Sequence, residues 1–343
     1  MKPTVPIRSA LTDPGLLGNV LAGDSWRAWR TLLIAAMGEA LSDDERETFK
    51  KLTGRQHEPG QRVEELCVIA GRRGGKSRAM ATLAAYLGGL CKHPLVRGER
   101  GVLLCIAPDQ RQAAIVLDYT TAAFEQSPIL KQLIANRTAD TLELSNGISI
   151  EVRASSFRRL RGPTFVAVIC DEAAFWFSDE LAANTDTEIV NAVRPGLATT
   201  GGPLIIASSP YAKAGLVWEL HRQHYGAAGD PLVLVAQGAS RDLNPSLSEA
   251  VVTRALARDE AAARAEYLGQ FRERGGGNRR RRDAAAAGRP ASWAQPVAAP
   301  ALGSWQRMAL KRSSIVSRRL SYGAIRLQRR ACRSNALDFA ARV

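Results

Sequence analysis

A glycine-rich segment between an apolar run and the start of a helical pattern constrains this chain more than any other feature. The apolar run Leu66–Ala70 leads into Gly71-Arg72-Arg73-Gly74-Gly75, and Lys76-Ser77 open a segment typical of a helix that extends to Leu90. This is the strand–loop–helix context of a phosphate-binding P-loop. Small residues let backbone N–H groups surround phosphate oxygens, and the helix N-terminus adds partial positive charge. The pattern G-x-x-x-x-G-K-[ST] is met except at its first position, which Ala70 occupies.

The P-loop interpretation gives each residue of the segment a role. The Lys76 ammonium would reach the β- and γ-phosphates of ATP, and the Ser77 hydroxyl would ligate Mg²⁺. The residues expected to bind the nucleotide are Gly71, Arg73, Gly74, Gly75, Lys76 and Ser77. The alternative is an ordinary glycine-rich turn that contains Gly-Lys-Ser by chance.

A second apolar run ends in two acids about a hundred residues further along the chain. Phe165–Cys170 is apolar and is followed by Asp171-Glu172, which predicts a buried parallel strand ending in carboxylates. Asp171 would hold Mg²⁺, directly or through water. Glu172 would orient and polarise the attacking water, a role that every hydrolytic NTPase has to fill. Together, the two segments predict nucleotide hydrolysis.

Further polar and basic residues are predicted to lie near the phosphates. Ser208 and Ser209 stand at the end of an apolar run that begins at Pro203, and ligands of doubly wound sheets lie at the carboxyl ends of the strands. Their hydroxyls would sense a γ-phosphate, although an ordinary strand-to-helix turn would show the same residues. Arg72 is placed to stabilise transition-state charge within the chain. The arginine cluster at 158–161 would serve a neighbouring subunit or DNA phosphate, with a solvated loop as the alternative.

Apolar runs alternate with helical patterns over most of the chain, which predicts an α/β fold. The strands are expected at 65–70, 101–107, 165–172, 203–208 and 232–236. Asn146-Gly147 predicts a hairpin within 141–152. The pattern indicates a P-loop NTPase of the RecA/ASCE-like class, with a mostly parallel sheet and helices on both faces. We assign this ATPase domain to residues 63–271.

An N-terminal helical segment, residues 1–62, is predicted to flank the ATPase domain. Residues 1–24 carry repeated Pro and Gly and are expected to be loop. Trp26 and Trp29 follow at helical spacing; core packing is their favoured role, and contact with the nucleotide base is the alternative. A capping-box-like start at Ser42 predicts a second helix that stops at Gly54.

The positive charge of the chain is confined to its C-terminal part. Residues 1–271 carry 30 basic and 30 acidic residues, whereas residues 272–343 carry 17 basic and 3 acidic ones, which accounts for the net charge of +14. The body of the chain therefore offers no global electrostatic case for DNA binding. Residues 272–343 are low in complexity and are predicted to be a disordered basic tail. Because the sequence contains no membrane-spanning run, signal peptide or C-x-x-C motif, we expect a cytoplasmic protein without a membrane partner.

Taken together, these motifs resemble those of a large terminase, the ATP-driven DNA-packaging motor of tailed bacteriophages. The resemblance runs from about Asp13 to Phe271 and rests on the segments 71–77, 156–162, 169–176, 194–196, 208–211 and 263–271. It implies that Arg72 is similar to the cis-acting arginine of the terminase P-loop and that Ser208-Ser209 couple hydrolysis to movement. In the family an aromatic–Gln element contacts adenine, and its nearest counterpart here is Trp29-Arg30.

The resemblance also implies partners. It predicts double-stranded DNA as the translocated substrate, a portal protein and a small terminase subunit as protein partners, and a homo-oligomeric ring as the active form, in the cytoplasm of a bacterial host. The other interpretations are a different P-loop DNA translocase or helicase, and a non-functional prophage remnant.

The resemblance fails at the C-terminus. Members of the family continue into an RNase H-like nuclease, in which a cluster of acids holds two metals. Residues 272–343 contain only three acids, too few for two-metal chemistry, so we expect no nuclease activity. One hypothesis is that this segment is the out-of-frame translation of a nuclease gene segment, and a genuine basic DNA-binding arm is the alternative.

Overall fold

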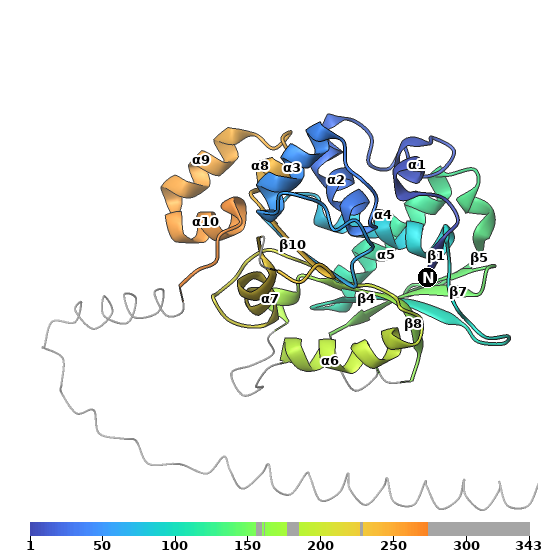
Figure 1. Cartoon of the computed structure of the whole chain (residues 1–343). Coiled ribbons are helices and arrows are strands. Elements are labelled where there is room, and N and C mark those ends of the chain that lie inside the picture. The colour runs from blue at the N-terminus through green and yellow to red at the C-terminus, as the bar shows by residue number, and fades with distance from the viewer. Residues whose placement is uncertain (156–159, 161, 177–184, 227–228, 274–343) are drawn as a thin grey trace, which may run out of the picture. The chain divides into compact units, whose positions relative to one another are not determined.

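The computed structural model describes residues 1–155, 160, 162–176, 185–226 and 229–273 (Figure 1). Of the predicted tail, only Arg272 and Glu273 belong to these residues. The arginines at positions 158, 159 and 161 lie outside them, as does the predicted disorder of the tail from residue 274 onward.

A mixed sheet of eight strands forms the centre of the described part of the chain, in the order β10–β2–β9–β8–β4–β7–β6–β5. The pairs from β10 across to β7 are parallel, and the two pairs that join β7, β6 and β5 are antiparallel. The predicted α/β class with a mostly parallel sheet is therefore confirmed. The strands are β2 (Glu65–Ala70), β4 (Gly101–Ala107), β5 (Ile134–Arg137), β6 (Thr141–Leu144), β7 (Ile148–Ala154), β8 (Thr164–Asp171), β9 (Leu204–Ser208) and β10 (Val233–Gly238).

Helices cover both faces of this sheet (Figure 1). On one face lie α2 (Arg27–Ala36), α3 (Asp43–Thr53), α4 (Lys76–Gly89) and α5 (Gln110–Gln126). On the other lie α6 (Thr185–Ala198) and α7 (Leu216–His224). A parallel strand covered on both faces needs apolar side chains on both. This explains why β4 is buried along its whole length and why its sequence reads as an unbroken apolar run.

The N-terminal segment is more regular than its sequence indicates. The expectation that residues 1–24 are loop is wrong, because this stretch contains α1 (Ile7–Thr12) and the strand β1 (Lys2–Pro3), which pairs with β3 (Cys91–Lys92). Ile7, Ala10 and Leu11 of α1 are buried in the core. Their spacing places them on one helix face, and packing of that face outweighs the nearby Pro and Gly residues.

The start and end of α3 agree with the sequence. The Ser42 hydroxyl accepts a hydrogen bond from the Glu45 N–H, and the Glu45 carboxylate accepts one from the Ser42 N–H, a complete capping box. Gly54 ends the helix in the left-handed conformation that glycine adopts without strain.

After β10 the chain forms α8 (Ser240–Leu243), α9 (Glu249–Arg258) and α10 (Glu260–Leu268). It then returns to the sheet, where Arg272 forms an isolated parallel bridge with Ala212, in the loop after β9. None of the described helices is long and apolar enough to cross a membrane.

Candidate nucleotide-binding site

The carboxyl ends of three neighbouring parallel strands bring the predicted site residues together. In the sheet, β9 lies between β2, which leads into the glycine-rich loop, and β8, which ends at Asp171. Ile69 of β2 is in register with Ser208, and Ala207 is in register with Asp171. This is the edge of an open α/β sheet at which ligands bind.

The glycine-rich loop occupies residues 71–75, between β2 and α4. Two of its residues have left-handed backbone, Arg73 with φ 64° and Gly75 with φ 90°. A side chain at Gly75 would approach the Trp26 ring to 2.8 Å, so this position requires glycine for space as well as for conformation. The 14-residue helix α4 begins at Lys76, directly after the loop, and the N–H groups of its first turn have no partner within the helix.

Side chains from other parts of the chain hold the backbone carbonyls of this loop. The Trp29 Nε1–H donates to the Gly74 carbonyl at 2.6 Å, the Ser240 hydroxyl to the Arg72 carbonyl at 2.6 Å, and the Asn244 amide to the Arg73 carbonyl at 2.8 Å. Because the peptide bond is planar and trans, each carbonyl held in this way turns the next N–H away from the supporting side chain. The three contacts therefore fix the orientation of the loop amides.

Lys76 is buried at the junction of the three strands. Its Nζ donates to the Ser209 hydroxyl at 2.8 Å and to the Ala70 carbonyl at 3.3 Å, and it lies 3.2 Å from the Glu172 Oε1. Only 6% of the side chain is exposed. The structure thus brings Lys76 of the glycine-rich loop into contact with Glu172 after β8 and with Ser209 after β9.

Glu172 is held in a strained position by the end of β9. Its backbone is left-handed, with φ 50° and ψ 41°, which costs a residue other than glycine about 1–3 kcal/mol and is typical of functional sites. The Oε2 accepts a hydrogen bond from the Ser209 N–H at 2.9 Å. The Ser208 hydroxyl has one proton to donate, and two acceptors are within its reach: the Glu172 Oε2 at 3.4 Å and the Ser209 carbonyl at 2.9 Å. The Ser208 Oγ also accepts from the Ala174 N–H at 3.1 Å. The two serines therefore position this carboxylate.

Asp171 has the environment of an incomplete cation ligand. It is 2% exposed, and its Oδ1 is buried without a hydrogen-bond partner among the described residues. Burial, and then repulsion from Glu172, raise its pKa to about 7, against the opposing effect of Lys76. The Ser77 hydroxyl stands in the first turn of α4 and is half-buried.

A magnesium ion fits this donor set. Mg²⁺ takes oxygen ligands and is usually bound through one or two carboxylates plus substrate phosphates and water, so it needs no larger protein cage. The described residues contain no group of three or more His, Cys, Asp or Glu placed to hold a metal.

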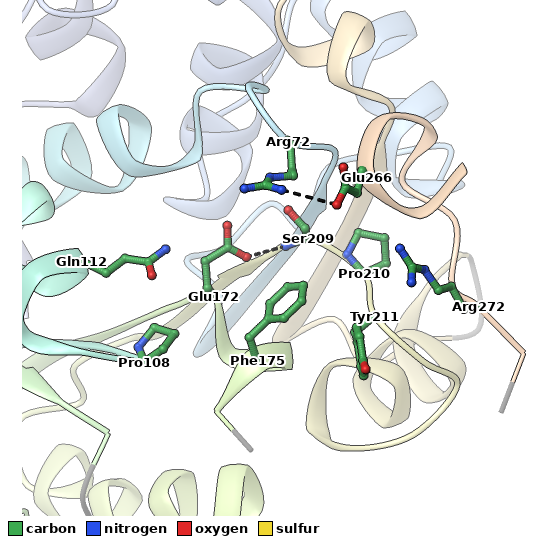
Figure 2. Close-up of a pocket in the computed structure, with 10 residues that line it drawn as sticks. All are labelled: Arg72, Pro108, Gln112, Glu172, Phe175, Ser209, Pro210, Tyr211, Glu266 and Arg272. Atoms are coloured by element: carbon green, nitrogen blue, oxygen red, sulfur yellow. Dashed lines mark hydrogen bonds and ion pairs between the residues drawn. The ribbon is translucent and has the colours of Figure 1, made fainter. Parts of the chain in front are cut away.

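A cavity of about 440 Å³ opens beside these groups (Figure 2). Glu172 and Ser209 line it on the side of the strands, and Arg72, Glu266 and Arg272 line it on the side of α10 and the segment that follows. Phe175 and Tyr211, whose ring centroids are 5.4 Å apart, are both about two-fifths exposed at its margin. Glu266, Phe175 and Tyr211 lie within the segments 263–271, 169–176 and 208–211 that carry the resemblance, but sequence reasoning assigned none of them a role at the site.

Arg72 lies at the margin of the cavity. Its Nη1 is 3.3 Å from the Glu266 Oε1, and its backbone N–H donates to the Glu266 carbonyl at 2.5 Å. The side chain is 63% exposed. The structure therefore places Arg72 at the same cavity as Glu172, with its guanidinium directed toward α10.

Trp29 supports the loop from within the core. Its side chain is fully buried, and its indole N–H donates a hydrogen bond to the Gly74 carbonyl. Trp29 therefore packs in the core, and it could stack on a nucleotide base only if its side chain moved. Arg30 donates to the carbonyls of Leu21 and Gly23.

No family model and no curated protein matches the sequence. Solved structures do match. The ATPase domain of the Thermus phage P74-26 large terminase is 21% identical, with a TM-score of 0.48, over 68% of this chain and 99% of that one. The HK97 bacteriophage large terminase is 16% identical, with a TM-score of 0.49, over 73% of this chain and 56% of that one.

A third match is the large terminase of a thermophilic bacteriophage in complex with ADP. It is 13% identical, with a TM-score of 0.44, over 61% of this chain and 48% of that one. Identities this low assign no function, which has to come from the residues of this chain.

Proposed function

We propose that this chain binds ATP with Mg²⁺ and hydrolyses it, as the ATPase part of a large terminase. One observation carries the proposal: Lys76, Glu172 and Ser209 converge within 2.8–3.2 Å of one another at the carboxyl ends of adjacent parallel strands. A buried lysine, a carboxylate and oriented backbone amides are the groups that phosphoryl transfer to water requires, and Glu172 and Ser209 carry this cluster to the wall of the cavity.

Lys76 and the loop amides bind the phosphates. In the absence of nucleotide, Glu172 neutralises the buried ammonium. Phosphate oxygens replace that carboxylate as the partner of Lys76. The N–H groups of residues 73 and 75–77 surround the phosphate chain, because those of Gly71, Arg72 and Gly74 are bonded to carbonyls of the protein. Asp171 and Ser77 would hold Mg²⁺, which would neutralise charge on the phosphates.

Glu172 acts as the general base. Once Lys76 turns to phosphate, the carboxylate is free to accept a proton from the attacking water, and the Ser209 N–H still fixes its orientation. Ser208 and Ser209 therefore contribute to hydrolysis by positioning Glu172. A shift of the end of β9 would displace the Glu172 carboxylate, because both serines contact it. Arg72, at the same cavity, supplies cationic charge to the transition state.

The packaging role is part of the same proposal and is supported by the terminase-like motifs. The chain would assemble as a ring with a portal protein and a small terminase subunit in the cytoplasm of a bacterial host, and would translocate double-stranded DNA. The low acid content of residues 272–343 supports the absence of nuclease activity from this chain.

Two variants test the hydrolysis. Lys76→Ala should abolish ATP binding, because it removes the buried ammonium that would hold the phosphates. Glu172→Gln should keep binding and lower turnover by about 10²–10⁴-fold, the usual contribution of a general base. Binding is measured by calorimetry with a non-hydrolysable ATP analogue, and turnover by phosphate release. Turnover of Glu172→Gln at the wild-type rate would overturn the assignment of the base.

A further inference from the structure

The chain beyond α10 returns to the nucleotide cavity and is fixed there by its backbone. The Arg272 N–H donates to the Tyr211 carbonyl at 2.9 Å, and the Lys213 N–H donates to the Arg272 carbonyl at 3.0 Å. Tyr211 follows Ser208-Ser209-Pro210 directly. Arg272 is thereby attached to the same loop that positions Glu172.

The side chain of Arg272 is directed into this cavity. Figure 2 shows its guanidinium pointing from the terminal segment toward Pro210 and Glu266. Its Nε is buried without a hydrogen-bond partner, and no ion pair with it is found among the described residues. The two nearby acids are used elsewhere: Glu266 pairs with Arg72, and Glu273 pairs with Lys213.

A buried guanidinium donor without an acceptor is costly, because it has lost water and gained nothing in return. The guanidinium is always charged and presents five N–H groups in a rigid fork that matches phosphate oxygens. Arg272 therefore has the geometry and the unused hydrogen-bonding capacity of a residue that awaits an anion in the cavity.

We propose that Arg272 contacts the terminal phosphate of the bound nucleotide and makes the site discriminate ATP from ADP. This inference rests on the proposed function. It concerns the γ-phosphate because Arg272 shares its cavity with Glu172 and Ser209, the groups assigned to the attacking water. A contact there also makes the backbone of residues 211–213 and 272 sensitive to which nucleotide is bound.

The test compares affinities for a non-hydrolysable ATP analogue and for ADP, measured by calorimetry on the full chain. Arg272→Ala should weaken binding of the analogue by about tenfold, the value of one charge-assisted hydrogen bond, and change ADP affinity less than about twofold. Arg272→Lys should recover part of the loss. The control is Arg264→Ala on α10, which removes an exposed arginine paired with Glu260 and should leave both affinities unchanged.

A second measurement on the wild-type chain covers the case in which Arg272→Ala does not fold. Hydrogen exchange of the Arg272 and Lys213 amides should be slower with the ATP analogue than with ADP. Equal protection by the two nucleotides, or equal loss of both affinities in Arg272→Ala, would overturn the inference. The proposed ATPase function would still stand in that case, provided that the wild type binds both nucleotides and Lys76→Ala binds neither. If the wild type binds no nucleotide, the proposed function fails first.

Discussion

Ser208 and Ser209 are adjacent in the sequence but have different tasks in the structure. The Ser209 hydroxyl accepts a hydrogen bond from Lys76, whereas the Ser208 hydroxyl contacts the Glu172 side chain and accepts the Ala174 N–H. The first contact concerns Lys76, which we propose binds phosphate, and the second concerns the position of Glu172, the proposed general base. The two serines can therefore be separated by kinetics.

We expect Ser208→Ala to lower kcat for ATP hydrolysis by about tenfold with KM nearly unchanged, because loss of the contact loosens the base and a small misplacement slows the chemistry. Ser209→Ala keeps the backbone N–H that orients Glu172 and should act mainly on KM. Steady-state phosphate release at varied ATP concentration measures both. A rise in KM for Ser208→Ala with unchanged kcat would assign this serine to binding instead.

Trp29 offers a test of how the glycine-rich loop is held. In Trp29→Phe the Gly74 carbonyl loses its buried donor, and a buried acceptor left without a partner costs about 1–3 kcal/mol. We expect the free energy of unfolding in urea to fall by that amount and ATP affinity to fall as well, because the loop amides lose their fixed orientation. Trp218→Phe is the control for the free energy of unfolding only, since the ring of Trp218 packs on Phe271 and lies near Lys213, beside the segments proposed to respond to nucleotide. Equal effects of the two variants would show that the Gly74 contact has no special role.

Lys76, Asp171 and Glu172 could be proposed as site residues from the sequence because each belongs to a short motif in which neighbouring residues specify its setting, and their role stays a prediction. The residues that support them could not. Ser240 and Asn244 hold loop carbonyls from 168 and 171 residues away, and nothing in a serine or an asparagine indicates a partner at that distance. Such contacts become visible only after the sheet has brought the segments together.

Among the elements, α3 owes part of its anchoring to one carboxylate. The Glu58 carboxylate accepts hydrogen bonds from Arg46 of α3 at 3.1 and 3.2 Å and from the Leu41 N–H at 2.9 Å. These contacts, chiefly the one from Arg46, lower the pKa of Glu58 to about 2. The stabilising effect is therefore fully present above the ordinary pKa of 4.5 and is lost as the pH falls toward 2.

We accordingly expect Glu58→Gln to be less stable than the wild type by about 1–2 kcal/mol near neutral pH, with the difference shrinking between pH 4.5 and pH 2. Urea unfolding at several pH values measures it. Glu47→Gln is the control, because Glu47 forms an exposed pair with Lys50 on the same helix. A difference that does not change with pH would mean that Glu58 acts through packing and not through its charge.

The strands were more predictable than the N-terminal helix for a physical reason. The strands β4, β8 and β9 are covered on both faces, so their apolar runs are continuous and easy to recognise. The helix α1 is only six residues long and begins after Pro6. A single buried face of three residues in a stretch with much Pro and Gly gives a weak local signal, and tertiary packing decides its conformation.

For the molecule as a whole, charge divides the chain at the point where the described domain ends. Residues 1–273 carry 31 basic and 31 acidic residues, and residues 274–343 carry 16 basic and 2 acidic ones. Nucleic acid attracts proteins chiefly through phosphate, and that attraction depends on the number of cationic side chains in contact and falls steeply with salt. The two parts should therefore differ in DNA binding although they belong to one chain.

A chain ending at Glu273 should unfold cooperatively and bind ATP as the full chain does, because residues 1–273 contain every group assigned to the site. Its affinity for double-stranded DNA at low salt should be lower by at least about tenfold. The slope of log K against log salt should become less negative, by about one for each phosphate contact that the removed residues made. Fluorescence anisotropy of labelled DNA at several salt concentrations measures both quantities. If the shortened chain binds DNA with the same slope as the full chain, the DNA contacts lie in the neutral domain. They would then have to come from a local cluster such as the arginines at 158–161, whose replacement by alanine is the next variant to compare.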